Sequence, residues 1–194
     1  MNPWFGFGVF IAGTALSVVI RVPHDRRSQE TKVTQSRKGT LEIALLAAMA
    51  LGLLILPVVA MATSWLAFAD YPLHPVAFAL GALAMAAGLW VFHRAHADLG
   101  RNWSVTLEIR ESHALVTQGV YRSVRHPMYS AIYLLALAQA LLVPNFIAGP
   151  ACLVAFTLMF ALRVPREERM MLDAFGGQYR DYASRTRRVI PGVW

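Results

Sequence analysis

The feature that most constrains this chain is a run of 36 residues without a charged side chain, from Pro127 to Leu162. A helix that crosses a membrane needs about 20 apolar residues, so this run is too long for one span. Pro144 and Asn145 interrupt it near its middle, and this pair is typical of a turn. The run therefore predicts a helical hairpin with arms at about 129–143 and 146–163.

Three earlier stretches of the chain, 1–20, 43–69 and 75–92, are equally free of charged side chains. We expect them to form membrane spans at about 3–20, 43–68 and 75–94. The composition agrees, since 57% of the residues are hydrophobic and 15% are charged, whereas soluble domains are about a quarter charged. The sequence thus predicts an all-α integral membrane protein of about five transmembrane helices, with residues 1–194 forming a single domain.

The 18 lysine and arginine residues, which leave the chain with a net charge of +7, are grouped. They lie in the segments 21–38, 93–128 and 163–194. Five spans place these segments on one side, and the positive-inside rule predicts that this side is cytoplasmic and the N-terminus outside. Attraction to anionic lipid also accounts for the charge. We therefore expect the lipid bilayer as a partner, no nucleic acid, since no binding motif accompanies the charge, and no evident partner protein.

Shorter signals indicate structure within and between the spans. Pro57 indicates a kink in the second span, and the weak alternation of Val105 to Ile109 predicts a short strand. Pro165 suits the first turn of a helix, and Gly176 suits its end. The following "QYRDYASRT" predicts a second short helix.

Several familiar sites are absent from the sequence. It has no glycine-rich dinucleotide or phosphate loop, no zinc-binding spacing of Cys and His, and no G-x-S-x-G nucleophile turn. The one cysteine, Cys152, lies in an apolar run and is expected in the core. His93 and His96 are compatible with a metal pair, but polar residues at a membrane interface explain them better. We therefore predict no metal site.

Polar groups gather where the long uncharged run begins and ends. A helix that starts at Pro127 presents free N–H groups suited to an anion, and Tyr121 and Tyr129 offer flat faces and hydroxyls. Arg163 ends the last apolar arm with a fork-shaped cation suited to a carboxylate, and Glu167 follows one turn later. The chemistry alone predicts an inner-face site for an anionic or zwitterionic small molecule.

A simpler interpretation of the same residues stays open. The arginines then form a snorkelling collar, and the tyrosines form an aromatic belt. Glu167 either favours a helix N-terminus or pairs with Arg163. On this interpretation these residues anchor the helices and bind no ligand.

Three blocks of sequence carry a resemblance to a known family. They read "LGRNWS" from Leu99, "HALVTQGVYRSVRHPMY" from His113 and "RVPREERMMLDAFGGQYRDY" from Arg163. In this order they resemble the isoprenylcysteine carboxyl methyltransferase (ICMT) family of integral-membrane methyltransferases. Membrane sterol reductases carry an element similar to R-H-P-x-Y, so the order of all three blocks makes the resemblance specific.

The resemblance implies methyl transfer from S-adenosylmethionine to the α-carboxylate of a C-terminal prenylated cysteine, with S-adenosylhomocysteine as the product. It implies a cytoplasmic cofactor site built from elements at about 99–129 and 163–194. The residues that it assigns to the cofactor are Glu108, His113, Ala114, Leu115, Val116, Tyr121, His126, Pro127, Met128, Tyr129 and Glu167. It assigns Arg163 to the substrate, so Arg163 and Glu167 are the expected catalytic residues, with Glu168 in support of Glu167.

This reaction suits the residues, because a carboxylate is already a nucleophile at neutral pH and needs no general base. Positioning and electrostatics would then carry catalysis. One alternative is a methyltransferase for another lipophilic substrate, such as a phospholipid amine or a thiol. A second alternative is an NADPH-dependent membrane reductase, and a third is a scaffold or lipid-binding protein, which would tolerate alanine at His126, Tyr129 and Glu167.

Overall fold

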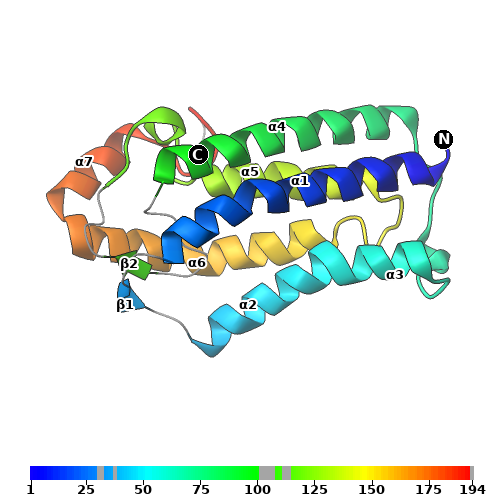
Figure 1. The fold of residues 1–194 in the computed structure, drawn as a ribbon, viewed down its shortest axis with the longest axis horizontal. Helices are drawn as coiled ribbons and strands as arrows, with labels where there is room; N and C mark the ends of the chain where they lie inside the picture. The colour runs from blue at the N-terminus through cyan, green and yellow to red at the C-terminus, as the bar shows by residue number, and fades with distance from the viewer. Residues whose placement is uncertain (30–32, 37–38, 101–107, 111–114, 193–194) are drawn as a thin grey trace.

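The computed structural model of this chain is a bundle of long helices (Figure 1). Backbone is described at 1–29, 33–36, 39–100, 108–110 and 115–192, and side chains at 1–25, 39–100 and 115–192. The helices are α1 (Pro3–Gln29), α2 (Thr40–Ala50), the π-helix η1 (Leu51–Ile55), α3 (Leu56–Ala62), the 3-10 turn η2 (Ala67–Ala69), α4 (Pro75–Leu99), the 3-10 turn η4 (Gly119–Arg122), α5 (Pro127–Leu142), α6 (Ala151–Phe175) and α7 (Gly177–Arg185). The predicted all-α class is confirmed, with one small pair of strands in addition.

The strands are β1 (Val33–Ser36) and β2 (Glu108–Arg110), which pair antiparallel. Ser36 is opposite Glu108, and Val33 is opposite Arg110. The sequence predicted a strand at 105–109. The described strand starts at Glu108, and residues 105–107 lie outside the described residues.

Within the described residues, three helical segments are long and apolar enough to cross a membrane. They are Pro3–Asp25, Thr40–Ala62 and Pro75–Leu99. The apolar helix α5 is shorter, and it packs with α6 as the predicted hairpin. The second arm was predicted from about residue 146, but α6 begins at Ala151 because the preceding residues form the turn.

The helix α6 continues through Pro165 without a break. The sequence placed Pro165 in the first turn of a helix and left open whether the preceding span runs on through it. Proline removes one backbone donor but does not always end a helix. Since α6 is continuous here, Arg163 and Glu167 lie about one turn apart on a single helix. The predicted end at Gly176 is confirmed, and its φ of 53° is one that glycine adopts readily. The predicted short helix after it is α7.

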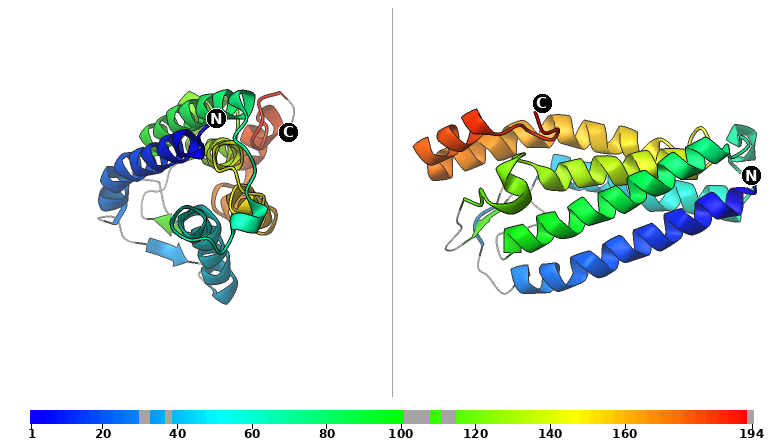
Figure 2. Two further views of the ribbon diagram at one scale, coloured as in Figure 1. Left: turned by 90° about the vertical axis from the view of Figure 1, so that its right-hand side faces the viewer. Right: turned by 90° about the horizontal axis from the view of Figure 1, so that it is seen from above.

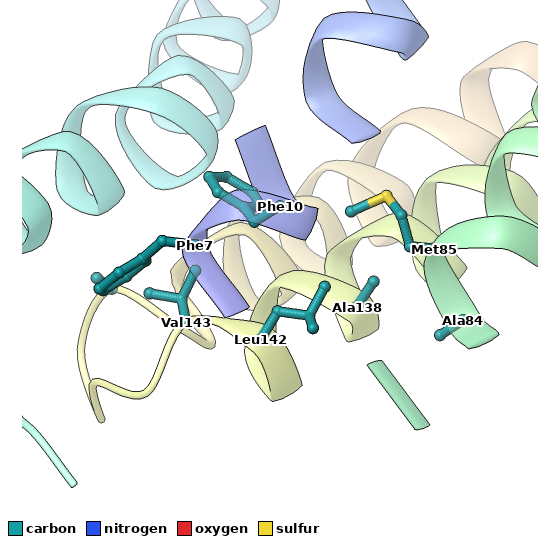
Figure 3. Close-up of a cluster of buried hydrophobic side chains, with 8 residues drawn as sticks. Phe7, Phe10, Ala84, Met85, Ala138, Leu142 and Val143 are labelled. Atoms are coloured by element: carbon teal, nitrogen blue, oxygen red, sulfur yellow. The ribbon is translucent and has the colours of Figure 1, made fainter. Parts of the chain in front are cut away.

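Seen along the helices, α5 lies between α4 and α6 (Figure 2). Glycines on α4 permit α5 to approach it closely. A Cβ at Gly81 would lie 2.8 Å from Cγ of Leu142, and a Cβ at Gly88 would lie 2.9 Å from Cδ2 of Leu135. Small residues serve this role in membrane helix pairs. The contact continues into α1 as a buried cluster (Figure 3). Its members are Phe7, Phe10, Ala84, Met85, Ala138, Leu142, Val143 and Ala148.

The predicted kink at Pro57 takes the form of the π-helix η1, which joins α2 to α3. In a π-turn the N–H of a residue donates to the carbonyl five residues earlier, which for position 57 is that of Gly52. Pro57 has no N–H, so it leaves this carbonyl without that donor. Gln139 of α5 supplies a donor instead. Its Nε2 donates to Gly52 O at 2.8 Å and to Ala148 O at 2.8 Å. This side chain thereby ties η1 to α5 and to the turn before α6.

Asn145 organises the turn between α5 and α6 and is fully buried. Its Nδ2 donates to Leu66 O at 2.8 Å and to Asp70 Oδ1 at 2.7 Å. Its Oδ1 accepts hydrogen bonds from the backbone N–H groups of Ile147 and Ala148. One side chain thus joins the hairpin turn to the connection between α3 and α4.

We expect Asn145→Ala to destabilise the protein by about 2–4 kcal/mol, because the buried N–H of Ala148 and the half-buried carbonyl of Leu66 lose these hydrogen bonds. The measurement is the midpoint of thermal unfolding in detergent. Phe146→Ala is the control, since Phe146 is adjacent but 71% exposed, and it should change the midpoint little. Equal midpoints for Asn145→Ala and the wild type would contradict this account of the turn.

One end of the bundle gathers the strand pair, η4, α7 and the C-terminal half of α6 (Figure 1). The N-terminus, the α3–α4 connection and the α5–α6 turn lie at the opposite end. The described parts of the segments that hold the lysines and arginines therefore lie at one end. Tyr121 in η4 and His126 and Tyr129 at the start of α5 lie at this same end.

Candidate functional site

The start of α5 directs Tyr129 toward α6. The helix begins at Pro127, and proline is favoured there because its φ is preset and it lacks an N–H. The carbonyl of His126 accepts a hydrogen bond from the N–H of Tyr129 at 3.0 Å, which fixes the first turn. The hydroxyl of Tyr129 donates to Oε2 of Glu167 at 2.8 Å. This bond joins two residues that the sequence assigned to one site.

Aromatic rings surround Tyr129. Phe156 stacks on its ring with 5.6 Å between centroids, and Phe160 meets it edge-on at 5.5 Å. The ring of His126 also lies edge-on, at 5.4 Å. Tyr129 is 8% exposed and Glu167 is half-buried, so their hydrogen bond is partly buried. A hydrogen bond to a charged group is among the stronger ones in proteins.

Arg163 lies one turn before Glu167 on α6, and it contacts α2. Its Nη1 is 3.2 Å from Oε1 of Glu42, a residue in the first turn of α2. The two side chains are 9% and 8% exposed. The structure thus brings a second carboxylate, one that no motif indicated, to the residue expected to hold substrate.

Glu168, the next residue after Glu167, is bound by three basic side chains. Its Oε1 accepts from Nε of Arg125 at 3.0 Å and lies 3.3 Å from Nε2 of His126. Its Oε2 accepts from Nη2 of Arg188 at 3.1 Å. Burial raises the pKa of this carboxyl, but the bonds from His126, Arg188 and Arg125 outweigh burial and lower the pKa to about 2. Glu168 is therefore a permanently charged anchor at neutral pH.

The segment after α7 runs beside the residues that precede α5. The N–H of Arg125 donates to Arg187 O at 2.7 Å, and the N–H of His126 donates to Arg188 O at 2.9 Å. The side chain of Arg125 also donates to the carbonyls of Ala183 and Thr186. Arg125 thus belongs to an internal network and is more than a membrane collar.

Tyr121 is held beside this network by η4. Gly119 has a φ of 59°, and a Cβ there would collide with the carboxylate of Asp98, so the turn requires glycine. The carbonyl of Tyr121 accepts from the hydroxyl of Tyr182 at 2.6 Å. Burial, and next the charge of Glu167, raise the pKa of Tyr121 above its usual range, so its hydroxyl remains a donor.

The structure brings His126, Tyr129 and Glu167 together, with Tyr121 close enough to sense the charge of Glu167. The other predicted cofactor residues with described side chains are buried or half-buried: Leu115, Val116, Pro127 and Met128. Glu108 is described only as backbone of β2, and His113 and Ala114 lie outside the described residues.

The two histidines considered as a metal pair do not converge. His96 is buried, with Nδ1 2.8 Å from Phe92 O, whereas His93 is exposed. In the part of the chain that the structure describes, no group of three or more His, Cys, Asp and Glu residues could hold a metal ion.

Glu42 and Arg188 were not selected from the sequence. Glu42 carried one signal, because it is an acidic residue directly before an apolar span, a position where a charge is unfavourable unless it is paired. Arg188 carried none, since the positive-inside rule already accounts for arginines in the tail. Their roles depend on contacts between segments far apart in the sequence.

The class that this architecture defines is a helical membrane protein with a polar site at one end of its helices. Residues 80–173 match the model of the isoprenylcysteine carboxyl methyltransferase (ICMT) family, so the resemblance indicated by the motifs is confirmed. The matched segment includes Tyr121, His126, Tyr129, Arg163 and Glu167.

Curated relatives match about the same part of the chain. It is 38% identical over 96 residues to protein-S-isoprenylcysteine O-methyltransferase B of Arabidopsis thaliana, covering 48% of this chain and 49% of that protein. It is 30% identical over 115 residues to protein-S-isoprenylcysteine O-methyltransferase of Schizosaccharomyces pombe, covering 58% and 48%. The chain thus spans about half the length of the curated relatives it matches.

Proposed function

We propose that this protein is an S-adenosylmethionine-dependent methyltransferase that methylates the α-carboxylate of an isoprenylcysteine-like lipophilic substrate. The observation that carries this proposal is the bonded pair of Tyr129 and Glu167, with Arg163 one turn away on the same helix. All three residues lie in the segment that matches the ICMT family. The names of the two relatives, both protein-S-isoprenylcysteine O-methyltransferases, support the same activity.

The chemistry of the described side chains fits S-adenosylmethionine, which supplies an electrophilic methyl group on a sulfonium when bound. A sulfonium and an α-amino group are cationic, so a carboxylate and aromatic faces are suitable neighbours. Glu167 supplies the carboxylate, and Tyr129 and Tyr121 supply the rings and hydroxyls. We propose the remaining contacts at Glu108, His113, Ala114, Leu115, Val116, His126, Pro127 and Met128.

The roles of the charged residues follow from this arrangement. Arg163 holds the oxygens of the substrate carboxylate and orients one of them toward the methyl group. Glu167 offsets the cationic charge, and Tyr129 fixes its position. Phe156 and Phe160 keep water away from the site. The prenyl chain enters sideways from the bilayer between the apolar helices.

We also propose the orientation of the protein in the membrane. The N-terminus lies outside, and the site and the C-terminus are cytoplasmic. The clustering of the basic segments at one end of the bundle supports this orientation. Residues 1–194 then form one multi-pass domain, with cofactor-binding elements at about 99–129 and 163–194.

Binding of S-adenosylhomocysteine to detergent-purified protein, measured by calorimetry, tests the cofactor. We expect binding that Glu167→Gln and Tyr129→Phe each weaken about tenfold, since each removes one side of a charge-assisted hydrogen bond. Tyr133→Phe is the matched control, because Tyr133 packs on the same rings, Phe156 and Phe160. It should bind as the wild type does.

Two other results would overturn the proposal. Binding of NADPH in place of S-adenosylhomocysteine would favour a reductase, and no cofactor binding at millimolar concentration would favour a scaffold. Labelled S-adenosylmethionine with a farnesylcysteine analogue then tests the acceptor. Transfer to a phospholipid amine or a thiol, but not to the carboxylate, would keep the class of enzyme and change its substrate.

A further inference from the structure

Glu42 occupies an unusual place for an acidic residue. It lies in the first turn of α2, near the start of the membrane-length segment Thr40–Ala62 and outside the segment that matches the family. The helix dipole favours a glutamate at this position. The dipole does not require the side chain to be buried, because an exposed glutamate would interact with it as well. Glu42 is instead 7% exposed, and it faces Arg163 of α6.

The surroundings of Glu42 belong to the candidate site. Leu45, one turn further along α2, is a member of the buried cluster that contains Tyr129, Phe156 and Phe160. Glu42 contacts Arg163, which lies one turn before Glu167, the hydrogen-bond partner of Tyr129. Glu42 is therefore close to where the substrate carboxylate would bind, and α2 forms part of the wall there.

The geometry of the contact between Glu42 and Arg163 would allow another carboxylate to replace Glu42. Its N–O distance is 3.2 Å, yet Oε1 of Glu42 accepts no aligned hydrogen bond within the described part of the chain. Arg163 offers a fork that binds a well-placed carboxylate through two parallel bonds. An incoming carboxylate with bidentate geometry would therefore be a better partner for Arg163 than Glu42 is.

Counting charges shows why both carboxylates would not share Arg163. Glu42 lies against the guanidinium of Arg163, with Arg21 of α1 as a further cation nearby. Two carboxylates placed at the same guanidinium nitrogen atoms would repel each other strongly in a buried environment. A carboxylate substrate therefore has to displace Glu42. A neutral acceptor has no charge with which to displace it.

We propose that Glu42 is a specificity-determining residue that occupies Arg163 until a carboxylate substrate displaces it. The inference rests on the proposed function. In the transfer, a carboxylate oxygen forms a bond to the methyl carbon, while the carbon–sulfur bond breaks and its electron pair stays on sulfur. One anion and one sulfonium become a neutral ester and a neutral thioether, and no proton moves. The ester no longer competes for Arg163, so Glu42 pairs with it again and favours product release.

Steady-state methylation of a farnesylcysteine analogue by Glu42→Gln tests this role. We expect its KM for the acid to fall about tenfold, and inhibition by the methyl ester product to become stronger, because the competing charge is gone. The affinity for S-adenosylhomocysteine should stay within about twofold. Glu42→Asp keeps the charge and should behave like the wild type.

A purely structural Glu42 would give a different pattern. Glu42→Gln would then lower kcat or leave KM for the acid unchanged or raised, and that result overturns the inference. If Glu42→Gln does not fold, the role of Glu42 is tested by thermal unfolding of the wild type with the acid and with the ester. In the presence of S-adenosylhomocysteine, the acid should raise its unfolding temperature at about one tenth of the ester concentration that has the same effect. Equal effects of acid and ester contradict the role of Glu42, whereas a wild type that transfers no methyl group contradicts the proposed function itself.

Discussion

Arg163→Ala is expected to reduce methylation of a prenylcysteine carboxylate by about 10²–10³-fold, the effect of losing one group that positions and stabilises reacting charge. Cofactor binding should persist, because Tyr129 and Glu167 hold their contact without Arg163. The measurements are single-turnover methylation with labelled S-adenosylmethionine and calorimetry with S-adenosylhomocysteine. A loss of both together in a folded variant would contradict the division of roles between Arg163 and Glu167.

The structure shows that Arg163→Ala needs a companion variant. The substitution leaves the carboxylate of Glu42 buried without this partner, and breaking a buried pair destabilises a protein by about 3–5 kcal/mol. Arg163→Ala combined with Glu42→Gln removes both charges and should unfold nearer to the wild-type temperature. If the double variant is stable, binds S-adenosylhomocysteine and still transfers no methyl group, the loss of activity belongs to Arg163 and not to misfolding.

The helical architecture could be predicted because it depends on local properties of the sequence. A long uncharged run has to be placed in lipid or in a core, and Pro144 with Asn145 divides the longest run into the two arms of α5 and α6. The pairing of Tyr129 with Glu167 could be anticipated only through the family resemblance. Nothing in the spacing of these residues along the chain requires them to meet.

The contacts that the sequence did not predict are long-range electrostatic pairs. Glu42 meets Arg163, and Arg188 meets Glu168, only after the helices have packed. Charge counting favoured a membrane collar for the arginines because the positive-inside rule needs no partner for them. The sequence left open whether the last span continues through Pro165, since local preference places proline in a first turn, and α6 does continue through it.

Glu168→Gln is expected to destabilise the protein by about 3 kcal/mol at neutral pH, near the low end for a broken ion cluster because Glu168 is 18% exposed. The substitution leaves Arg125 and Arg188 facing each other without the carboxylate that joins them. The segment after α7 should then detach from the start of α5. Thermal unfolding in detergent measures the loss, and faster proteolysis near the C-terminus should accompany it.

The stabilisation that the Glu168 carboxylate provides should decrease at acidic pH. The folded-state pKa of Glu168 is lowered from 4.5 to about 2, so the stabilisation is complete above about pH 4.5 and is lost as the pH falls toward 2. The difference in unfolding temperature between the wild type and Glu168→Gln should therefore shrink across this interval. Glu167→Gln is the matched control, since it alters the adjacent carboxylate but leaves the contacts of Glu168 with Arg125 and Arg188 in place. A difference between the wild type and Glu168→Gln that stays constant from pH 7 to pH 2.5 would contradict the assignment of Glu168 as the charged anchor.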